Sequence, residues 1–421
     1  MVQIQPIPSG LLTQAQSADG TVIITNPRGN VLDLSAPGAI GSVITGVSNT
    51  ALGQGALDGV TTGLRDTAEG VSALGNLTTG NDNTAEGWAA LQALTTGSTN
   101  TAVGSGALKT KTTTSDSTAV GYNALNLSTA AGNVAVGSGA LAANTTGTTN
   151  TAVGLNALTT NITGVNSTAI GSSALTLATG NQNTAVGSSA LAAVTTGVDN
   201  TAIGFRASGL STGNQNTAVG SSALQLNIVG IQNVAVGTNA LRASTSAGEN
   251  TGVGMSAGNV ITTGIQNVAI GANTSESLTS GNTNTAVGYW AGDIVASGSN
   301  TTHIGNHSAG GAAVSNTTSV GATSVANAAN ATAVGFGASA TAAGSVAIGT
   351  DNTGAGAASA TANLMTLGTV LHSVRVPGWF LPQQATTVGA PAYVKGAIYF
   401  DTTLNKLRVG GAAAWETITS V

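Results

Sequence analysis

Two glutamates occupy equivalent places in a chain that carries few charged groups. Glu69 and Glu86 are each the third residue of a Thr-Ala-Glu-Gly segment. If each segment belongs to one coil of a stack and the coils are adjacent, the two carboxylates lie about 5 Å apart, as in a retaining glycosidase. A short repeated segment offers no cleft for a sugar, and a solvated surface pair is the alternative. We therefore expect a protein that is not an enzyme.

Two histidines are the candidate metal ligands. His303 and His307 flank Ile304-Gly305-Asn306, and His303 stands where the repeat described below usually has Ala. An oligomer axis could gather copies of such an imidazole around a metal ion. A packed or surface histidine is the alternative, because no nearby carboxylate completes a site. We expect no cofactor, since the many Gly-x-Gly matches recur as bends of the repeat.

The composition excludes several classes of protein. Of 421 residues, 6% are charged and 3% aromatic, and the absence of cysteine excludes disulfides and thiolate metal sites. The net charge is −5 with scattered basic residues, so nucleic acid is not an expected partner. Uninterrupted apolar runs of about 18 residues are absent, which argues against a membrane span. The N-terminus shows no secretory signal, and we expect synthesis in the cytoplasm without one.

A short repeat organises most of the chain. The motif Asn-Thr-Ala-Val-Gly-Ser-x-Ala-Leu stands at positions 100–108 and 183–191, with near copies elsewhere. Its glycine recurs at intervals of about 16–17 residues, which shorten to about 14 residues near the C-terminal end. The motif glycines are Gly53, Gly70, Gly87, Gly104, Gly121, Gly137, Gly154, Gly171, Gly187, Gly204, Gly220, Gly237, Gly254, Gly271, Gly288, Gly305, Gly321, Gly335 and Gly349.

This period predicts an all-β fold, a parallel β-roll or β-solenoid with one repeat per coil. It is too short for helical repeats, while Thr, Val and Ile favour extended backbone and Gly allows bends. Asn precedes the motif glycine by four positions in most repeats, so we expect a ladder of stacked amides. The Thr-Ala-Val arm is apolar on both faces, which predicts a homo-oligomer, with a homotrimeric fibre as the usual arrangement.

The repeats resemble a known family. Asn330-Ala331-Thr332-Ala333-Val334-Gly335 and Ser345-Val346-Ala347-Ile348-Gly349 are similar to the head repeats of trimeric autotransporter adhesins. The resemblance implies a left-handed parallel β-roll of three chains that binds host surface molecules. Two features depart from that family: most coils are longer than the family's own, and we expect neither the signal peptide nor the C-terminal membrane anchor of an autotransporter.

The two ends differ from the repeat region. Residues 396–410 predict a strand, a turn and a strand, and they resemble a module at the C-terminal ends of bacteriophage tail fibres. Thr21–Thr25 and the turn residues 26–30 indicate a hairpin in a small N-terminal module. We expect an attachment module at 1–48, a β-roll shaft at 49–350, a linker or neck at 351–376 and a β-hairpin tip at 377–421.

These observations predict a structural virion fibre, a phage tail fibre that attaches the particle to a host cell. Its expected partners are baseplate or tail proteins at the N-terminal module and a host surface glycan or protein at the tip. Aromatic residues at the tip suit receptor contact, although capping of the last coil is an equal alternative. Other possibilities are a capsid-attached fibre or decoration protein, a polysaccharide-degrading tailspike, and an adhesin of a bacterium or injection system. The receptor-binding candidates are Trp379, Phe380, Tyr393, Tyr399 and Trp415.

Overall fold

The computed structural model describes residues 49–350 and 355–368, and elsewhere only the backbone of seven strands. The described residues form strands and turns without any helix. The chain divides into two compact units, Met1–Thr369 and Val370–Val421. None of the described segments is a helix long and apolar enough to cross a bilayer.

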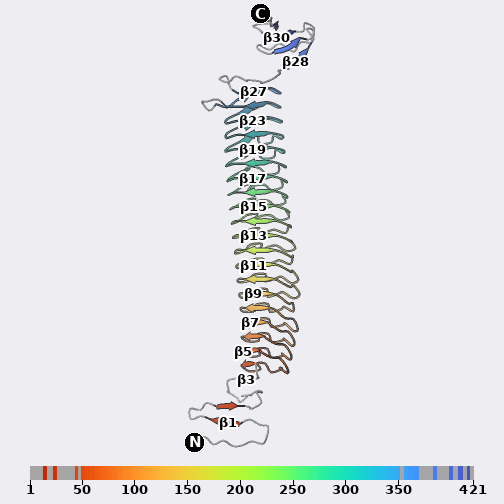
Figure 1. Ribbon diagram of the computed structural model, residues 1–421, viewed down its shortest axis with the longest axis vertical. Helices are drawn as coiled ribbons and strands as arrows, with labels where there is room; N and C mark the ends of the chain where they lie inside the picture. The colour runs from red at the N-terminus through yellow and green to blue at the C-terminus, as the bar shows by residue number, and fades with distance from the viewer. Residues whose placement is uncertain are drawn as a thin grey trace. The chain divides into compact units, whose positions relative to one another are not determined.

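A parallel β-solenoid forms the larger unit, with one short strand from each coil stacked on the next (Figure 1). The pairing is in register, so that Ala152 of one coil lies beside Ala169 of the next. The strands of this ladder are β4 (Thr50–Leu52), β5 (Thr67–Glu69), β6 (Thr84–Glu86), β7 (Thr101–Val103), β8 (Thr118–Val120), β9 (Val134–Val136), β10 (Thr151–Val153), β11 (Thr168–Ile170), β12 (Thr184–Val186), β13 (Thr201–Ile203), β14 (Thr217–Val219), β15 (Val234–Val236), β16 (Thr251–Val253), β17 (Val268–Ile270), β18 (Thr285–Val287), β19 (Thr302–Ile304), β21 (Thr318–Val320), β23 (Thr332–Val334), β25 (Val346–Ile348) and β27 (Met365–Leu367).

The strand register confirms the period seen in the sequence. Thr151 pairs with Thr168 and Thr168 with Thr184, which are the two longer coil lengths that the glycine spacing predicts. Thr318 pairs with Thr332, which is the shorter coil expected near the C-terminal end. Where the coils shorten, the second arm also becomes a strand and forms a second parallel sheet. That sheet consists of β20 (Ala309–Gly310), β22 (Val325–Ala326), β24 (Ser339–Ala340) and β26 (Ala358–Ser359).

The interior of the solenoid is made of small and medium apolar side chains. In each first arm, which we define as the ladder strand, the middle residue faces inward, as Ala152 does at 0% exposure. The second arm, which follows the motif glycine, contributes an Ala-Leu pair such as Ala157 and Leu158, both fully buried. The outer residue of the strand, such as Val153, stays 36% exposed. Within one chain the strand therefore buries its inner face only, and burial of the outer face by a partner stays a prediction.

The motif glycine is required where the first arm turns into the second. Gly204 has φ +137°, in a region that L-residues rarely adopt. A Cβ atom on Gly204 would lie 2.6 Å from the carbonyl oxygen of Gly220 in the next coil. Adjacent bends thus approach too closely for any side chain, which explains the constancy of this residue.

The predicted amide ladder is present along the opposite bend. The side-chain Nδ2 of Asn233 donates to Asn216 Oδ1 at 3.1 Å and to the carbonyl oxygen of Ala247 at 2.8 Å. Asn233 Oδ1 in turn accepts the backbone N–H of Asn250 at 3.1 Å. All of these asparagines are buried. Each amide therefore satisfies buried backbone groups of neighbouring coils, as buried polar groups require.

Two boundaries and one strand pairing differ from the sequence-based expectation. The ladder continues past residue 350, because β27 pairs with β25 across part of the expected linker 351–376. β3 (Val43–Thr45) pairs antiparallel with β4 and so joins the sheet, although we expected it in the separate N-terminal module. β2 (Val22–Thr25) is a strand as expected, but it pairs with the preceding β1 (Thr13–Gln16) rather than with a later segment. Asp19-Gly20, between β1 and β2, is a favoured hairpin pair.

The structure describes four strands in the smaller unit. β29 (Ile398–Asp401) and β30 (Lys406–Gly410) form the predicted antiparallel hairpin. β31 (Trp415–Thr417) pairs antiparallel with β30. β28 (Gln383–Ala385), which the sequence did not indicate, runs parallel to β29.

We predict that Asn233→Ala destabilises the solenoid. The substitution leaves the Ala247 carbonyl and the Asn250 N–H buried without the partners they have now, at a cost of about 1–3 kcal/mol for each group. Chemical denaturation would measure the loss. Asn306→Ala is the matched control, because Asn306 is exposed and its replacement should change the free energy of unfolding by less than about 0.5 kcal/mol. Equal stability of both variants would contradict a structural role for the ladder.

Candidate functional site

The two glutamates lie side by side on the outside of the solenoid. Glu69 and Glu86 are register partners in β5 and β6, as their spacing predicted. Both are exposed on the outer face of the strand, while Ala68 and Ala85, directly before them, face inward. The two side chains lie on a flat strand surface in contact with solvent, as the alternative to a catalytic pair predicted.

His303 lies in the interior of its coil. It is 1% exposed and follows Ala286 in the inward-facing column. Gly310 makes room for the ring, because a Cβ there would lie 2.8 Å from His303 Cε1. Neither ring nitrogen has a hydrogen-bond partner. Burial lowers the pKa of His303 to about 4, since the desolvated ring disfavours the charged form.

His307 lies on the outside, so the structure does not bring the two histidines into one site. Its ring stacks on Trp290 of the preceding coil, with ring centres 5.9 Å apart, and meets the edge of Tyr289 at 5.7 Å. A His303 side chain enclosed in its own coil cannot meet copies of itself at an oligomer axis, as the metal hypothesis required. In the part of the chain that the structure describes, no three His, Asp or Glu side chains are grouped to hold a metal ion.

The aromatic candidates at the C-terminal tip lie mostly outside the described residues. Trp379, Phe380 and Tyr393 are not described at all. Tyr399 stands in β29 and Trp415 in β31, for which only the backbone is described. Their role in receptor contact stays a prediction.

A buried lysine compensates for a missing asparagine in the amide ladder. Lys111 is fully buried where the two preceding coils carry Leu77 and Leu94. Its Nζ donates to Ser117 Oγ at 2.9 Å and to the carbonyl oxygen of Ala130 at 2.7 Å. Ser117 stands at the ladder position usually held by Asn, and the lysine makes the hydrogen bond to the backbone carbonyl that an Asn amide makes elsewhere, as Asn200 does to Gly213. Burial lowers the pKa of Lys111 to about 8.

The outer surface of the second arm carries a feature that sequence analysis missed. The residue directly after the motif glycine is often large, apolar and about half exposed, and we call this set the post-glycine column. The signal was available, because aligning the coils on the motif glycine brings these residues into one position. They are Val71, Trp88, Tyr122, Leu155, Phe205, Met255, Tyr289 and Phe336.

Backbone hydrogen bonds hold the post-glycine column in line. The carbonyl of Trp88 accepts the N–H of Gly106 at 2.9 Å, and that of Phe205 accepts the N–H of Ser222 at 2.9 Å. The same bond joins Tyr289 to His307 at 3.0 Å. Each bond links one coil to the next at the same turn, so the column runs parallel to the axis of the solenoid.

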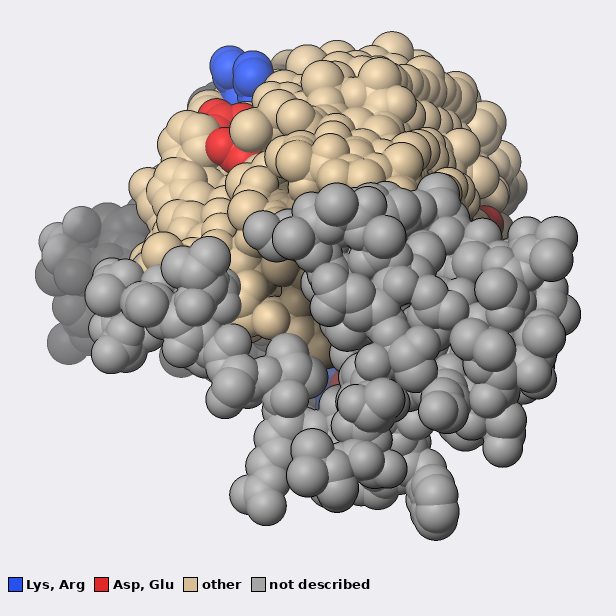
Figure 2. Space-filling model, turned by 90° about the horizontal axis from the view of Figure 1, so that it is seen from above, with Lys and Arg blue, Asp and Glu red and all other residues tan. Residues whose placement is uncertain are grey.

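Positive charge accompanies two of the exposed rings. Lys109 Nζ lies 4.7 Å from the ring centre of Trp88, and the Arg206 guanidinium lies 5.0 Å from that of Phe205. Both are within the range of cation–π attraction. Charged groups are otherwise sparse, and most of the described surface in Figure 2 carries none.

The described residues define a β-solenoid repeat protein. No protein-family model matches the chain, and no curated protein matches it either. The resemblances to adhesin heads and to phage tail-fibre tips therefore stay predictions.

We predict that His303 makes the solenoid sensitive to acid. Between about pH 6.5 and pH 4 the unfolded chain binds a proton that the buried ring does not, so stability should fall as pH falls. The slope from this group approaches about 1.4 kcal/mol per pH unit. Urea unfolding from pH 7 to pH 4 would measure it. His303→Ala should lose this part of the slope and His307→Ala should keep it; equal slopes in the two variants would refute the assignment.

Lys111 predicts a further rise of stability with pH, in the alkaline range. The folded amine loses its proton near pH 8, whereas an unfolded lysine holds it to about pH 10.5. The unfolded state therefore binds more protons in this window, and the free energy of unfolding should rise from pH 8 to pH 10. Lys111→Met should flatten that rise, and Lys109→Met on the surface should not. An unchanged pH profile in Lys111→Met would contradict the prediction.

Proposed function

We propose that the protein is a structural fibre of a virion, a phage tail fibre that attaches the particle to its host cell. The observation that carries the proposal is a stack of in-register coils that extends from β4 to β27. At about 4.8 Å per coil, such a stack acts as a spacer of roughly 90 Å. The resemblance of the C-terminal segment to tail-fibre tips supports a location of the protein in the virion. We propose that it is synthesised in the host cytoplasm first.

The proposal includes a homotrimer. The outer residues of consecutive strands are Val or Ile over long stretches, for example Val136, Val153 and Ile170, and each is 36–42% exposed in the single chain. A flat apolar face of this length is unfavourable in water. Copies of the same chain would cover it, and the adhesin resemblance favours three. The N-terminal module then binds baseplate or tail proteins, and the C-terminal tip contacts a host glycan or protein.

We propose a non-enzymatic role. Glu69 and Glu86 project from a flat outer strand face, whereas a glycosidase pair would hold its sugar in a cleft. Hydrolysis of a host polysaccharide that disappears in the variant with Glu69→Gln and Glu86→Gln would favour the tailspike alternative.

The native mass and a competition assay test the proposal together. The full chain should have about three times its mass of 40.3 kDa. Val153→Lys should lower that mass by placing a charge on the apolar strand face, whereas Ile162→Lys, exposed elsewhere in the same coil, should not. The soluble protein should also reduce adsorption of the virions that carry it. A stable monomer would refute the trimer, and unimpaired adsorption at saturating protein would refute the attachment role.

A further inference from the structure

The post-glycine column has the form of a binding track for an extended polymer. From Trp88 to Phe336 its large side chains recur every two or three coils, or about 10–14 Å. Small or polar residues such as Ser105, Ser138 and Ala272 lie between them. The large side chains therefore form separate contact points along the axis rather than one continuous apolar patch. A linear chain that touches the shaft at intervals suits the pattern.

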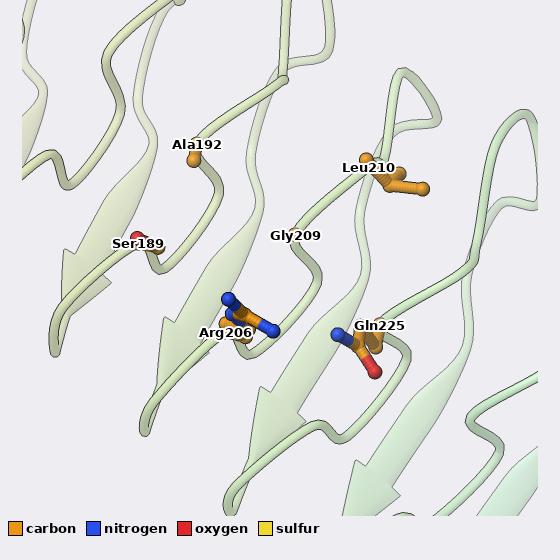
Figure 3. A pocket seen from close by; sticks show the side chains of 6 residues that line it. All are labelled: Ser189, Ala192, Arg206, Gly209, Leu210 and Gln225. Atoms are coloured by element: carbon orange, nitrogen blue, oxygen red, sulfur yellow. The ribbon is translucent and has the colours of Figure 1, made fainter.

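A pocket opens beside Arg206, the residue that follows Phe205. Its volume is about 250 Å³, and it spans three coils between Ser189 and Gln225. Figure 3 shows why it exists: Ala192 and Gly209 present almost no side chain at positions where other coils carry Lys109 and Arg242. Arg206 lines the pocket and also lies over the Phe205 ring. A guanidinium, a hydroxyl and an amide therefore line one pocket, and the exposed Phe205 ring lies 5.0 Å from the guanidinium.

The distribution of charged residues on this surface indicates what class of ligand it binds. Between positions 104 and 259, the basic groups other than the buried Lys111 all belong to the outer side of the second arm, and they are Lys109, Arg206 and Arg242. The acidic residues of that stretch stand instead at the other bend, directly before the amide ladder, where each has a positive φ. They are Asp116, Asp199 and Glu249. The second arm is thus positive over these coils although the whole chain is negative, whereas Glu276 and Asp293 stand at the position of Lys109 and Arg242 in the coils that follow.

We propose that the outer side of the second arm binds an acidic linear polysaccharide, with its best-formed subsite at Phe205 and Arg206. The apolar face of a sugar ring packs on the exposed Phe205 ring, and the Arg206 guanidinium pairs with a sugar carboxylate. Ser189 and Gln225 offer hydrogen bonds to hydroxyl groups within the pocket. The inference builds on the proposed attachment function, to which it adds a ligand class and a place on the shaft.

Affinity electrophoresis of the full chain in gels that contain alginate, a polyuronate, tests the inference. The expected result is retardation by alginate that weakens with added salt, and no retardation by neutral dextran. Phe205→Ala and Arg206→Asn should each weaken alginate binding by about tenfold or more, the second because Asn tolerates the positive φ at this position. Val229→Ala, which removes an exposed apolar side chain outside the column, should leave binding unchanged.

Three results of the electrophoresis would overturn the inference. They are alginate binding unaffected by Phe205→Ala, dextran binding as strong as alginate binding, and absence of binding to alginate. A change of native mass in Phe205→Ala would also overturn it, because the column would then contact another copy of the chain. The adsorption assay separates this inference from the proposed function. If the unaltered chain competes for adsorption but does not bind alginate, the track is refuted and the attachment role stands.

Discussion

The close stacking of coils in register is the constraint on which this structure depends. Every coil must accept backbone hydrogen bonds from its neighbours at both bends, and the bends approach until a Cβ on Gly204 would lie 2.6 Å from a carbonyl oxygen. Glycine at one bend and asparagine at the other are the residues that satisfy this spacing. The interior then has room for alanine and leucine and for few larger groups.

The interior accepts exceptions only where neighbouring residues compensate for them. His303 fits because Gly310 leaves space beside its ring. Lys111 fits because Ser117 and the Ala130 carbonyl take its hydrogen bonds. Asp66 stands in the amide ladder and accepts two hydrogen bonds from Asn83. Burial raises the pKa of Asp66, since the charged carboxylate loses solvation there.

Much of the fold could be predicted because one local signal repeats in each coil. The spacing of the motif glycines indicated the coil lengths, and the Asn positions indicated the amide ladder. The last coil escaped prediction because Val346 pairs with Met365 across a longer segment, which breaks the period. The antiparallel pairing of β3 has no repeated signature at all. The site was harder to predict, since a column on a solenoid is formed by residues that lie many positions apart, such as Trp88 and Phe205.

The equivalence of the coils has a consequence for how such a chain changes over generations. A single coil can be duplicated or deleted as a whole, because its neighbours on both sides offer the same hydrogen bonds. Each such event would lengthen or shorten the stack by about 4.8 Å and leave its cross-section intact. Recombination between repeats would then yield variants that differ in reach while keeping the same ends.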